Sequence, residues 1–287
     1  MLHQWHGTLQ LIHQALAEDE VAIDHTSALL PDDLTSEALM MPKAGGVLAG
    51  VEVSLEVFRQ VDPSLETVVL VEDGSPVEPG VNVAAIRGRM SSILRAERTA
   101  LNFVQRMSGI ATATNQLVRA IEDLPATILD TRKTLPGWRL LDKYSVRMGG
   151  GHNHRMSTAD GILIKDNHVA AMATRGESLV ELVHRARAEA PHTIRVEVEC
   201  DTLEQVREAL EGGAELILLD NMSLEQMREG VDLCRGRALT EASGGITLDS
   251  VRDIAETGVD LISSGALTHS VKALDISLEV RPDGSPA

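Results

Sequence analysis

The second half of the chain repeats an apolar segment, a turn and a helical pattern at a nearly constant interval. Four of the apolar segments end at Glu199, Asp220, Ser243 and Gly265, which are 21, 23 and 22 residues apart. Repeats of this length form parallel strands joined by right-handed crossovers. Because the carboxyl ends of such strands meet at one face of an α/β barrel, the sequence predicts a site at that face.

The strand-like segments of this half are "ATILD", "GILIKD", "TIRVEVEC", "LILLDN", "ALTEASGG" and "DLISSGA". The predicted fold class is therefore α/β, with an irregular barrel of parallel strands over residues 111–270. A doubly wound open sheet is the alternative, because spacing does not show whether a sheet closes.

The first part of the chain has a different pattern. A helix is expected over residues 9–17, and "GVLAGVEVS", "ETVVLVEDG" and "VNVAAIRG" are expected to be strands of a small sheet. Helical spacing then covers residues 91–123, with an interruption at Gly109. We assign residues 1–110 to an N-terminal α/β domain.

Charge and composition exclude several classes of partner. The chain has 43 acidic and 26 basic residues and a formal net charge of −17, which disfavours binding to nucleic acid or to an anionic membrane. There is no uninterrupted apolar run of membrane-spanning length and no signal-like start. Two cysteines give no disulfide framework. A cytoplasmic protein is expected.

One stretch departs from this acidic character. Residues 132–168 hold seven Lys or Arg against three Asp, around a triple glycine. Arg forks match carboxylates and Lys supplies a point charge, so the stretch predicts a pocket for a small dianion or trianion. The cations that define it are Arg132, Lys133, Arg155 and Lys165, with His154 beside them.

Carboxylates are expected at the same face. In "TIRVEVEC" the alternation directs Arg195, Glu197 and Glu199 away from the apolar face, into the barrel. Glu199 and Asp220 end successive strands and could hold Mg²⁺ together with substrate phosphates. An edge strand with its polar face in water, and a helix cap at Asp220, are the alternatives.

Two glycine-containing turns indicate a phosphate site. "EASGGI" and "SSGALTHS" each end a strand with glycine and hydroxyl residues just before an expected helix, so they would offer backbone N–H groups and the positive end of a helix dipole to an anion. On the last two strands of a barrel they match the usual phosphate position.

Four other interpretations of the basic stretch remain open. His152 and His154 could bind zinc, although no cysteine lies near them. Lys165 could form a Schiff base in a barrel lyase, or the protein could bind an anion without turnover. Any single cation could also belong to a solvated basic face.

The motifs also resemble a known family. "ERTALNFVQRMSGIAT", "LDTRKTLPGWRLLDKYSVRMGGGHNHR", "ILIKDNH", "VEVE", "ILLDN", "SGGI" and "GALTHS" occur in the order found in quinolinate phosphoribosyltransferases, and the resemblance covers residues 47–280. It implies that quinolinate and phosphoribosyl pyrophosphate are joined with Mg²⁺ to give nicotinate mononucleotide, pyrophosphate and CO₂. It also implies an N-terminal α/β sandwich, completed by residues 271–287, and an irregular barrel.

The resemblance assigns roles to individual residues. Arg132, His154, Arg155 and Lys165 would bind the quinolinate carboxylates, and Lys133 would contact the pyrophosphate. Glu199 and Asp220 would serve the ribose hydroxyls and Mg²⁺. Arg98 would enter the site of a partner subunit, which implies a homodimer; whether dimers form a hexamer is not decided. The phosphate would be surrounded by Ser243, Gly244, Gly265 and His269.

The sequence departs from the family pattern at two places. "LLPDDLTSEALMMPKAGG" lacks the early glycines of the family, and Met148 stands where a cysteine often precedes the triple glycine. The nearest rival is a paralogous phosphoribosyltransferase-like protein associated with molybdenum uptake, which would take a different acceptor. The intact "TRKT", "NHR" and "KDNH" motifs favour the quinolinate enzyme.

Overall fold

The computed structural model describes residues 5–282 and consists of two compact units. Of the described residues, the first unit combines 5–115, 134–150 and 270–282, and the second combines 116–133 and 151–269. The predicted domain boundary near residue 110 lies within one long helix, and residues 134–150 group with the first unit rather than with the second.

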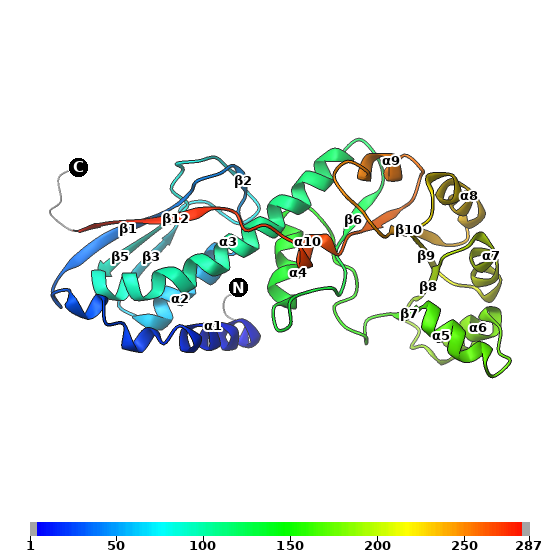
Figure 1. The fold of residues 1–287 in the computed structure, drawn as a ribbon, viewed down its shortest axis with the longest axis horizontal. Helices are drawn as coiled ribbons and strands as arrows, with labels where there is room; N and C mark the ends of the chain where they lie inside the picture. Colours follow the sequence, from blue (N-terminus) through cyan, green and yellow to red (C-terminus); the bar gives the residue numbers. More distant parts are fainter. Residues whose placement is uncertain (1–4, 283–287) are drawn as a thin grey trace. The chain divides into compact units, whose positions relative to one another are not determined.

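The first unit contains a four-stranded antiparallel sheet in the order β12-β1-β5-β3 (Figure 1). The strands are β1 (Thr35–Pro42), β3 (Glu66–Val69), β5 (Ala84–Arg89) and β12 (Ile276–Pro282). Through β12 the C-terminal segment pairs with β1. The sequence analysis missed β1, although its residues alternate between exposed or half-buried and buried positions, because turn residues precede it.

The prediction of a strand at "GVLAGVEVS" was wrong for most of its length. A short strand, β2 (Gly46–Val47), pairs with β4 (Pro76–Val77), and helix α2 (Val51–Val61) follows. Gly50 precedes the helix with φ of 86°. The carboxylate of Asp73 accepts hydrogen bonds from the backbone N–H groups of Gly50 (2.8 Å) and Val51 (3.1 Å). A distant acidic residue therefore caps a helix whose valines favour a strand.

Other helices complete this unit. They are α1 (His6–Glu18), the 3₁₀ turns η2 (Val21–Ile23) and η3 (Ser27–Leu29), α3 (Met90–Ala120) and α4 (Arg139–Met148). The expected interruption at Gly109 does not occur, since α3 is continuous there. A Cβ atom at Gly109 would lie 2.3 Å from the carbonyl oxygen of Lys272, so the glycine permits close approach of another segment.

The second unit is built on six parallel strands in the order β6-β11-β10-β9-β8-β7. All six predicted strands of this half are present: β6 (Thr127–Leu129), β7 (Ile162–Ile164), β8 (Val196–Cys200), β9 (Leu216–Asp220), β10 (Leu239–Ser243) and β11 (Leu261–Ser263). The α/β fold class is confirmed. Within residues 5–282, β6 and β7 are the edges of this sheet, and the segment at His152 bridges to Leu129 beside β6.

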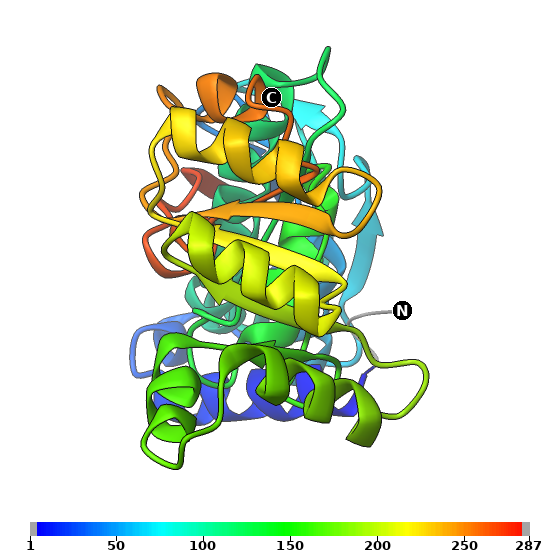
Figure 2. The same ribbon diagram turned by 90° about the vertical axis from the view of Figure 1, so that its right-hand side faces the viewer.

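Helices connect these strands. They are α5 (Asp166–Ala173), α6 (Leu179–Glu189), α7 (Leu203–Gly212), α8 (Leu224–Cys234), α9 (Val251–Ala255) and α10 (Ala266–His269). Figure 2 shows α6, α7 and α8 side by side on one side of the strands, and neighbouring helices contact one another. Three of them begin at hydroxyl caps, Ser178, Thr202 and Ser223, whose side chains accept the N–H three residues later. Across residues 5–282, every helix is too short or too polar to cross a membrane.

The predicted orientation of the β8 side chains is confirmed. Val196, Val198 and Cys200 are fully buried, whereas Glu197 and Glu199 line cavities on the opposite side of the strand. The sheet therefore presents an apolar face to its helices and a charged face to its interior.

Candidate active site

A cavity of about 320 Å³ lies at the carboxyl ends of the six strands. Residues in or directly after β6, β7, β8, β9, β10 and β11 all contribute to its lining, so the sheet curves around it. Eight of the predicted site residues line this cavity: Arg132, Lys133, His154, Arg155, Lys165, Glu199, Asp220 and Ser243. The ends of the repeated strands thus meet at one cavity.

Two cations follow β6. The side chain of Thr131 accepts a hydrogen bond from the backbone N–H of Lys133 (3.0 Å), and Thr268 Oγ1 donates to the carbonyl of Lys133 (2.8 Å). These bonds fix the backbone of the "TRK" turn. Arg132 and Lys133 are exposed at the cavity, where they are available to an anionic ligand.

The triple glycine allows close packing and a tight turn. A Cβ atom at Gly149 would lie 2.4 Å from the carbonyl oxygen of Ala111 and 2.6 Å from Cβ of Thr114, both on α3. Gly150 has φ of 88°, a conformation that side chains disfavour. The chain can therefore leave α4 directly after Met148.

His154 is held by a buried carboxylate. Asp130 is completely buried, and its side chain accepts the backbone N–H of His154 (2.9 Å) and the amide of Asn153 (2.6 Å). The backbone N–H of His152 donates to the carbonyl of Ile128 (2.8 Å). Residues 152–154 therefore run along β6, and this register brings His154 to the cavity.

The ring of His154 points at two glutamates. Its Nε2 lies 3.3 Å from Glu197 Oε2 and 3.7 Å from Glu241 Oε2, while its Nδ1 accepts the backbone N–H of Arg155 (2.7 Å). Arg155 Nη1 donates to the carbonyl of Gly161 (2.8 Å). Burial, and then repulsion by Arg132, lower the pKa of Arg155 from its ordinary value. An anionic ligand would relieve that repulsion.

Lys165 and the two predicted carboxylates lie at the ends of β7, β8 and β9. The ammonium group of Lys165 forms an ion pair with the carboxylate of Glu199. Asp220 accepts a hydrogen bond from the Asn221 amide (2.7 Å). The two carboxylates supply the hard oxygen ligands that Mg²⁺ prefers, and both remain at the cavity surface.

The two glycine turns, one after β11 and one after β10, differ in how soon a helix follows. After β11, α10 begins directly at Ala266, and a Cβ atom at Gly265 would lie 2.8 Å from Lys133 Cδ and 3.1 Å from the His269 ring. After β10, however, α9 begins as late as Val251. The expectation of a helix directly after "EASGGI" was therefore wrong, and that turn offers backbone N–H groups without a helix end.

Gly244 has φ of 95°, and a Cβ atom there would lie 2.2 Å from Asn221 Oδ1. The backbone N–H of Asn221 donates to the carbonyl of Ser243 (3.0 Å). The turns after β9 and β10 therefore support each other, and glycine is needed for their contact.

Four predicted residues are outside the cavity lining: Arg98, Gly244, Gly265 and His269. Gly265 and His269 contact one another beside Lys133, and Gly244 adjoins Ser243, so these three border the cavity. Arg98 is exposed on α3 in the first unit.

The sequence analysis missed several cavity residues, namely Thr131, Leu163, Leu218, Glu241 and Ser263. The strand alternation could have found Glu241 and Leu218, because each lies two positions before a predicted site residue on the same face of its strand.

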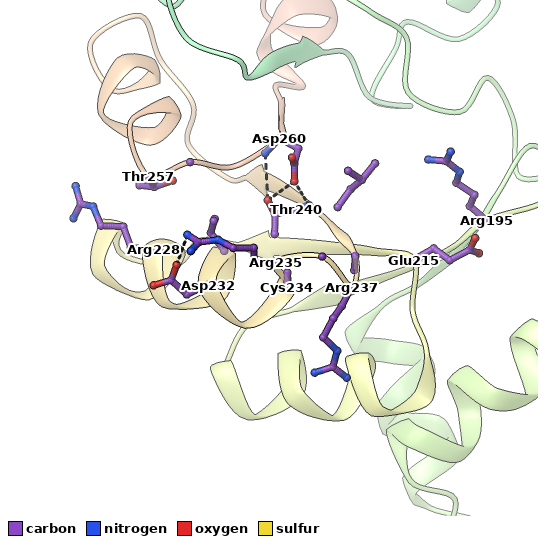
Figure 3. A pocket seen from close by; sticks show the side chains of 15 residues that line it. Arg195, Glu215, Arg228, Asp232, Cys234, Arg235, Arg237, Thr240, Thr257 and Asp260 are labelled. Atoms are coloured by element: carbon purple, nitrogen blue, oxygen red, sulfur yellow. Dashed lines mark hydrogen bonds and ion pairs between the residues drawn. The ribbon is translucent and has the colours of Figure 1, made fainter.

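A larger hollow of about 930 Å³ lies at the opposite ends of the strands and contains several arginines. Figure 3 shows that Arg195, Arg228, Arg235 and Arg237 point in different directions. Arg235 pairs with Asp232 (2.7 Å), and Arg237 donates to the carbonyl of Leu210 (3.1 Å). The guanidinium groups do not converge on one point, so this hollow lacks the organisation of the first cavity.

Family models and curated relatives match nearly the whole chain. The model "Quinolinate phosphoribosyl transferase, N-terminal domain" matches residues 24–108, and the corresponding C-terminal domain matches residues 110–279. A probable nicotinate-nucleotide pyrophosphorylase (carboxylating) of Bacillus subtilis is 42% identical over 94% of this chain and 92% of its own length. A quinolinate phosphoribosyltransferase (decarboxylating) of Nicotiana tabacum is 44% identical over 96% and 81%.

Solved structures agree with these matches. NadC from Streptococcus pyogenes has a TM-score of 0.90 at 39% identity and covers 95% of this chain and 96% of its own. The nicotinate-nucleotide pyrophosphorylase of Francisella tularensis has a TM-score of 0.90 at 38% identity, with 96% of both chains covered.

Proposed function

The chain belongs to the quinolinate phosphoribosyltransferase family, and on that premise we propose that it transfers the phosphoribosyl group of phosphoribosyl pyrophosphate to quinolinate. Decarboxylation then gives nicotinate mononucleotide, pyrophosphate and CO₂, as a step of NAD biosynthesis. The observation that carries this proposal is one cavity lined by four cations and three carboxyl groups, those of Glu199, Asp220 and Glu241. A dianionic acceptor and a phosphorylated sugar need both kinds of group.

The cations bind the acceptor. Arg132, Arg155 and Lys165, with His154, hold the two carboxylates of quinolinate, and Lys133 contacts the pyrophosphate. Charge-assisted hydrogen bonds to two carboxylates orient the ring nitrogen toward the sugar and select dicarboxylates over monocarboxylates.

Glu199 and Asp220 interact with the sugar substrate. Departure of pyrophosphate leaves a ribosyl centre with oxocarbenium character, which the negative charges of Glu199 and Asp220 stabilise. The same two residues bind the ribose hydroxyls. The phosphate is held near Ser243, Gly244, Gly265 and His269.

Mg²⁺ fits this donor set, because Glu199 and Asp220 end adjacent strands at one cavity and Mg²⁺ commonly binds through two carboxylates and substrate phosphates. When bound, it neutralises charge on the departing pyrophosphate. During decarboxylation the pyridinium within the substrate offsets the developing negative charge, so the basic residues mainly position the carboxyl groups.

The working protein in this proposal is a cytoplasmic homodimer in which Arg98 of one subunit enters the other subunit's site. The exposure of Arg98 on α3 and the two free, buried cysteines are compatible with it. Arg98→Ala and Arg132→Ala proteins should each be inactive. Mixed dimers of the two contain one intact site, so random reassembly restores about a quarter of the wild-type activity. Mixed dimers that recover no activity would contradict a site shared between the two subunits.

The deciding experiment measures CO₂ release from carboxyl-labelled quinolinate. Release should require quinolinate, phosphoribosyl pyrophosphate and Mg²⁺ together, and omission of the sugar substrate or the metal should abolish it. Folded protein that binds phosphoribosyl pyrophosphate but releases no CO₂ would have a different acceptor, and the proposal would fail.

A further inference from the structure

Two buried glutamates lie behind the residues assigned to substrate binding. Glu197 on β8 and Glu241 on β10 have side chains that are 8% and 1% exposed. One oxygen of each, Oε1, is buried and has no hydrogen-bond partner among the described residues. Two ionised carboxylates at such close range would repel each other strongly in a buried environment.

Among the described residues, His154 is the basic group within ion-pair distance of Glu241. A carboxylate oxygen of Glu197 and one of Glu241 lie within 4.8 Å of each other and of the His154 ring nitrogen. The strand between the two glutamates, β9, places Leu216 and Leu218 in the cavities, and its charged residue, Asp220, lies at the end of the strand in the active-site cavity. His154, from the segment beside β6, is the titratable group that faces both carboxylates, and Arg155 attracts Glu197.

Two buried carboxylates this close repel each other unless one of them carries a proton, which it can then donate in a hydrogen bond to the other. Burial, and then the charge of Glu197, raise the pKa of Glu241 to about 7. Glu241 is the more deeply buried of the two and is therefore the better site for the proton.

The same arrangement orients His154. Because Nδ1 of His154 accepts the backbone N–H of Arg155, the proton of a neutral ring resides on Nε2, where it faces Glu197. Glu241, His154 and Arg155 line both the active-site cavity and a second cavity of about 370 Å³ at the other ends of the strands. They lie between the two cavities, and the second one gives solvent protons a path to Glu241.

We propose that Glu241 is a positioning residue that carries a proton, donates it in a hydrogen bond to Glu197, and so keeps this pair at one negative charge beside the dianion-binding residues. The inference rests on the proposed function, because the ligand is the aromatic dicarboxylate. Ionisation of Glu241 would place a second negative charge next to His154 and Arg155 and would weaken dicarboxylate binding.

The sign of the pH effect follows directly. At a pH below its raised pKa Glu241 is protonated and quinolinate binds well; as the pH rises through that pKa Glu241 ionises, and the KM for quinolinate rises by up to about tenfold per pH unit. Glu241→Gln imitates the protonated acid in shape and charge. In that variant the KM for quinolinate should stay low and nearly constant from pH 6 to 9.

The experiment compares KM for quinolinate across this range in wild type, Glu241→Gln and a control, Glu229→Gln, whose exposed side chain pairs with Arg207 on the surface. Taking the ratio of variant to wild type cancels titration of the substrates. The control should follow the wild-type profile. Equal pH dependence in wild type and Glu241→Gln would overturn the proposal while leaving the proposed function intact.

Two further measurements keep the inference testable if the variant folds poorly. Infrared difference spectra of wild type should show a protonated carboxylic acid at pH 6 that is lost by pH 9, and absence of that band would overturn the proposal. Metal analysis of purified protein should find no stoichiometric ion. An ion bound by His154, Glu197 and Glu241, whose ligand atoms lie within 4.8 Å of one another, would show that a cation rather than a proton balances the charge.

Discussion

Lys165 and Glu199 form an ion pair across the ends of the adjacent strands β7 and β8. The Lys165 side chain is 44% exposed and the Glu199 side chain is 15% exposed, so the pair is partly accessible to ligand and solvent. In the proposed reaction the two groups serve different substrates, the acceptor and the sugar. Their contact therefore couples the two halves of the active site.

This coupling predicts non-additive kinetics. Lys165→Met and Glu199→Gln should each lower kcat/KM by about 100-fold or more, whereas the double variant should lose clearly less than the product of the two losses. Each single variant leaves one uncompensated charge, and the double variant leaves none. Steady-state kinetics of all four proteins test this; strictly multiplicative losses would mean that the pair does not act as a unit.

Arginines of the active-site cavity and of the larger hollow should differ in function. Arg155→Ala should weaken quinolinate binding by about 100-fold, because it removes a guanidinium group that can bind a carboxylate. Binding of phosphoribosyl pyrophosphate should remain measurable. Isothermal titration calorimetry checks both ligands.

Arg228→Ala is the matched control for this experiment, because Arg228 lines the hollow in which the arginines diverge. It should leave quinolinate affinity unchanged. A comparable loss in the control would show that the larger hollow, rather than the cavity at the strand ends, binds the acceptor.

Two helical glycines should respond oppositely to alanine. Gly7 lies in the first turn of α1 and has open space around it, so Gly7→Ala should raise the free energy of unfolding by about 0.5 kcal/mol or less. Gly109→Ala gains the same propensity but places Cβ 2.3 Å from the Lys272 carbonyl oxygen, and should lower the free energy of unfolding by about 1–3 kcal/mol. Urea denaturation measures both. Stabilisation by Gly109→Ala would contradict the close packing.

The two thiols should be inert in the native protein. Burial raises the pKa of Cys200 to about 12 and that of Cys234 to about 11, so at pH 8 almost no thiolate is present. A chromogenic disulfide reagent should react with neither thiol within minutes, and with both after denaturation. Thr158→Cys, at an exposed position, supplies the reactive control. Rapid reaction of the native protein would show that these strands and helices open locally.

The repeat and the chemistry at the ends of its strands could be read from local sequence patterns. In "TIRVEVEC" the alternation fixes which side chains share a face, and in "LILLDN" the abrupt change from apolar residues to Asp220 marks a strand end. Both signals are local, because side-chain direction in a strand follows from the pleated backbone. They indicated Glu199 and Asp220, which line the cavity, whereas the basic residues that line it were predicted from the charge of residues 132–168.

Other features of the fold and the site depend on residues that are distant in the sequence, and they follow only from the folded chain. Asp73 caps α2 from 22 residues away and overrides the strand preference of its valines, and β1 is completed by β12 from the other end of the chain. The contact between Glu197 and Glu241 arises only when β8 and β10 lie on the two sides of β9. Neither residue alone predicts it, because the energy of a buried carboxylate depends on the charges that the folded chain places around it.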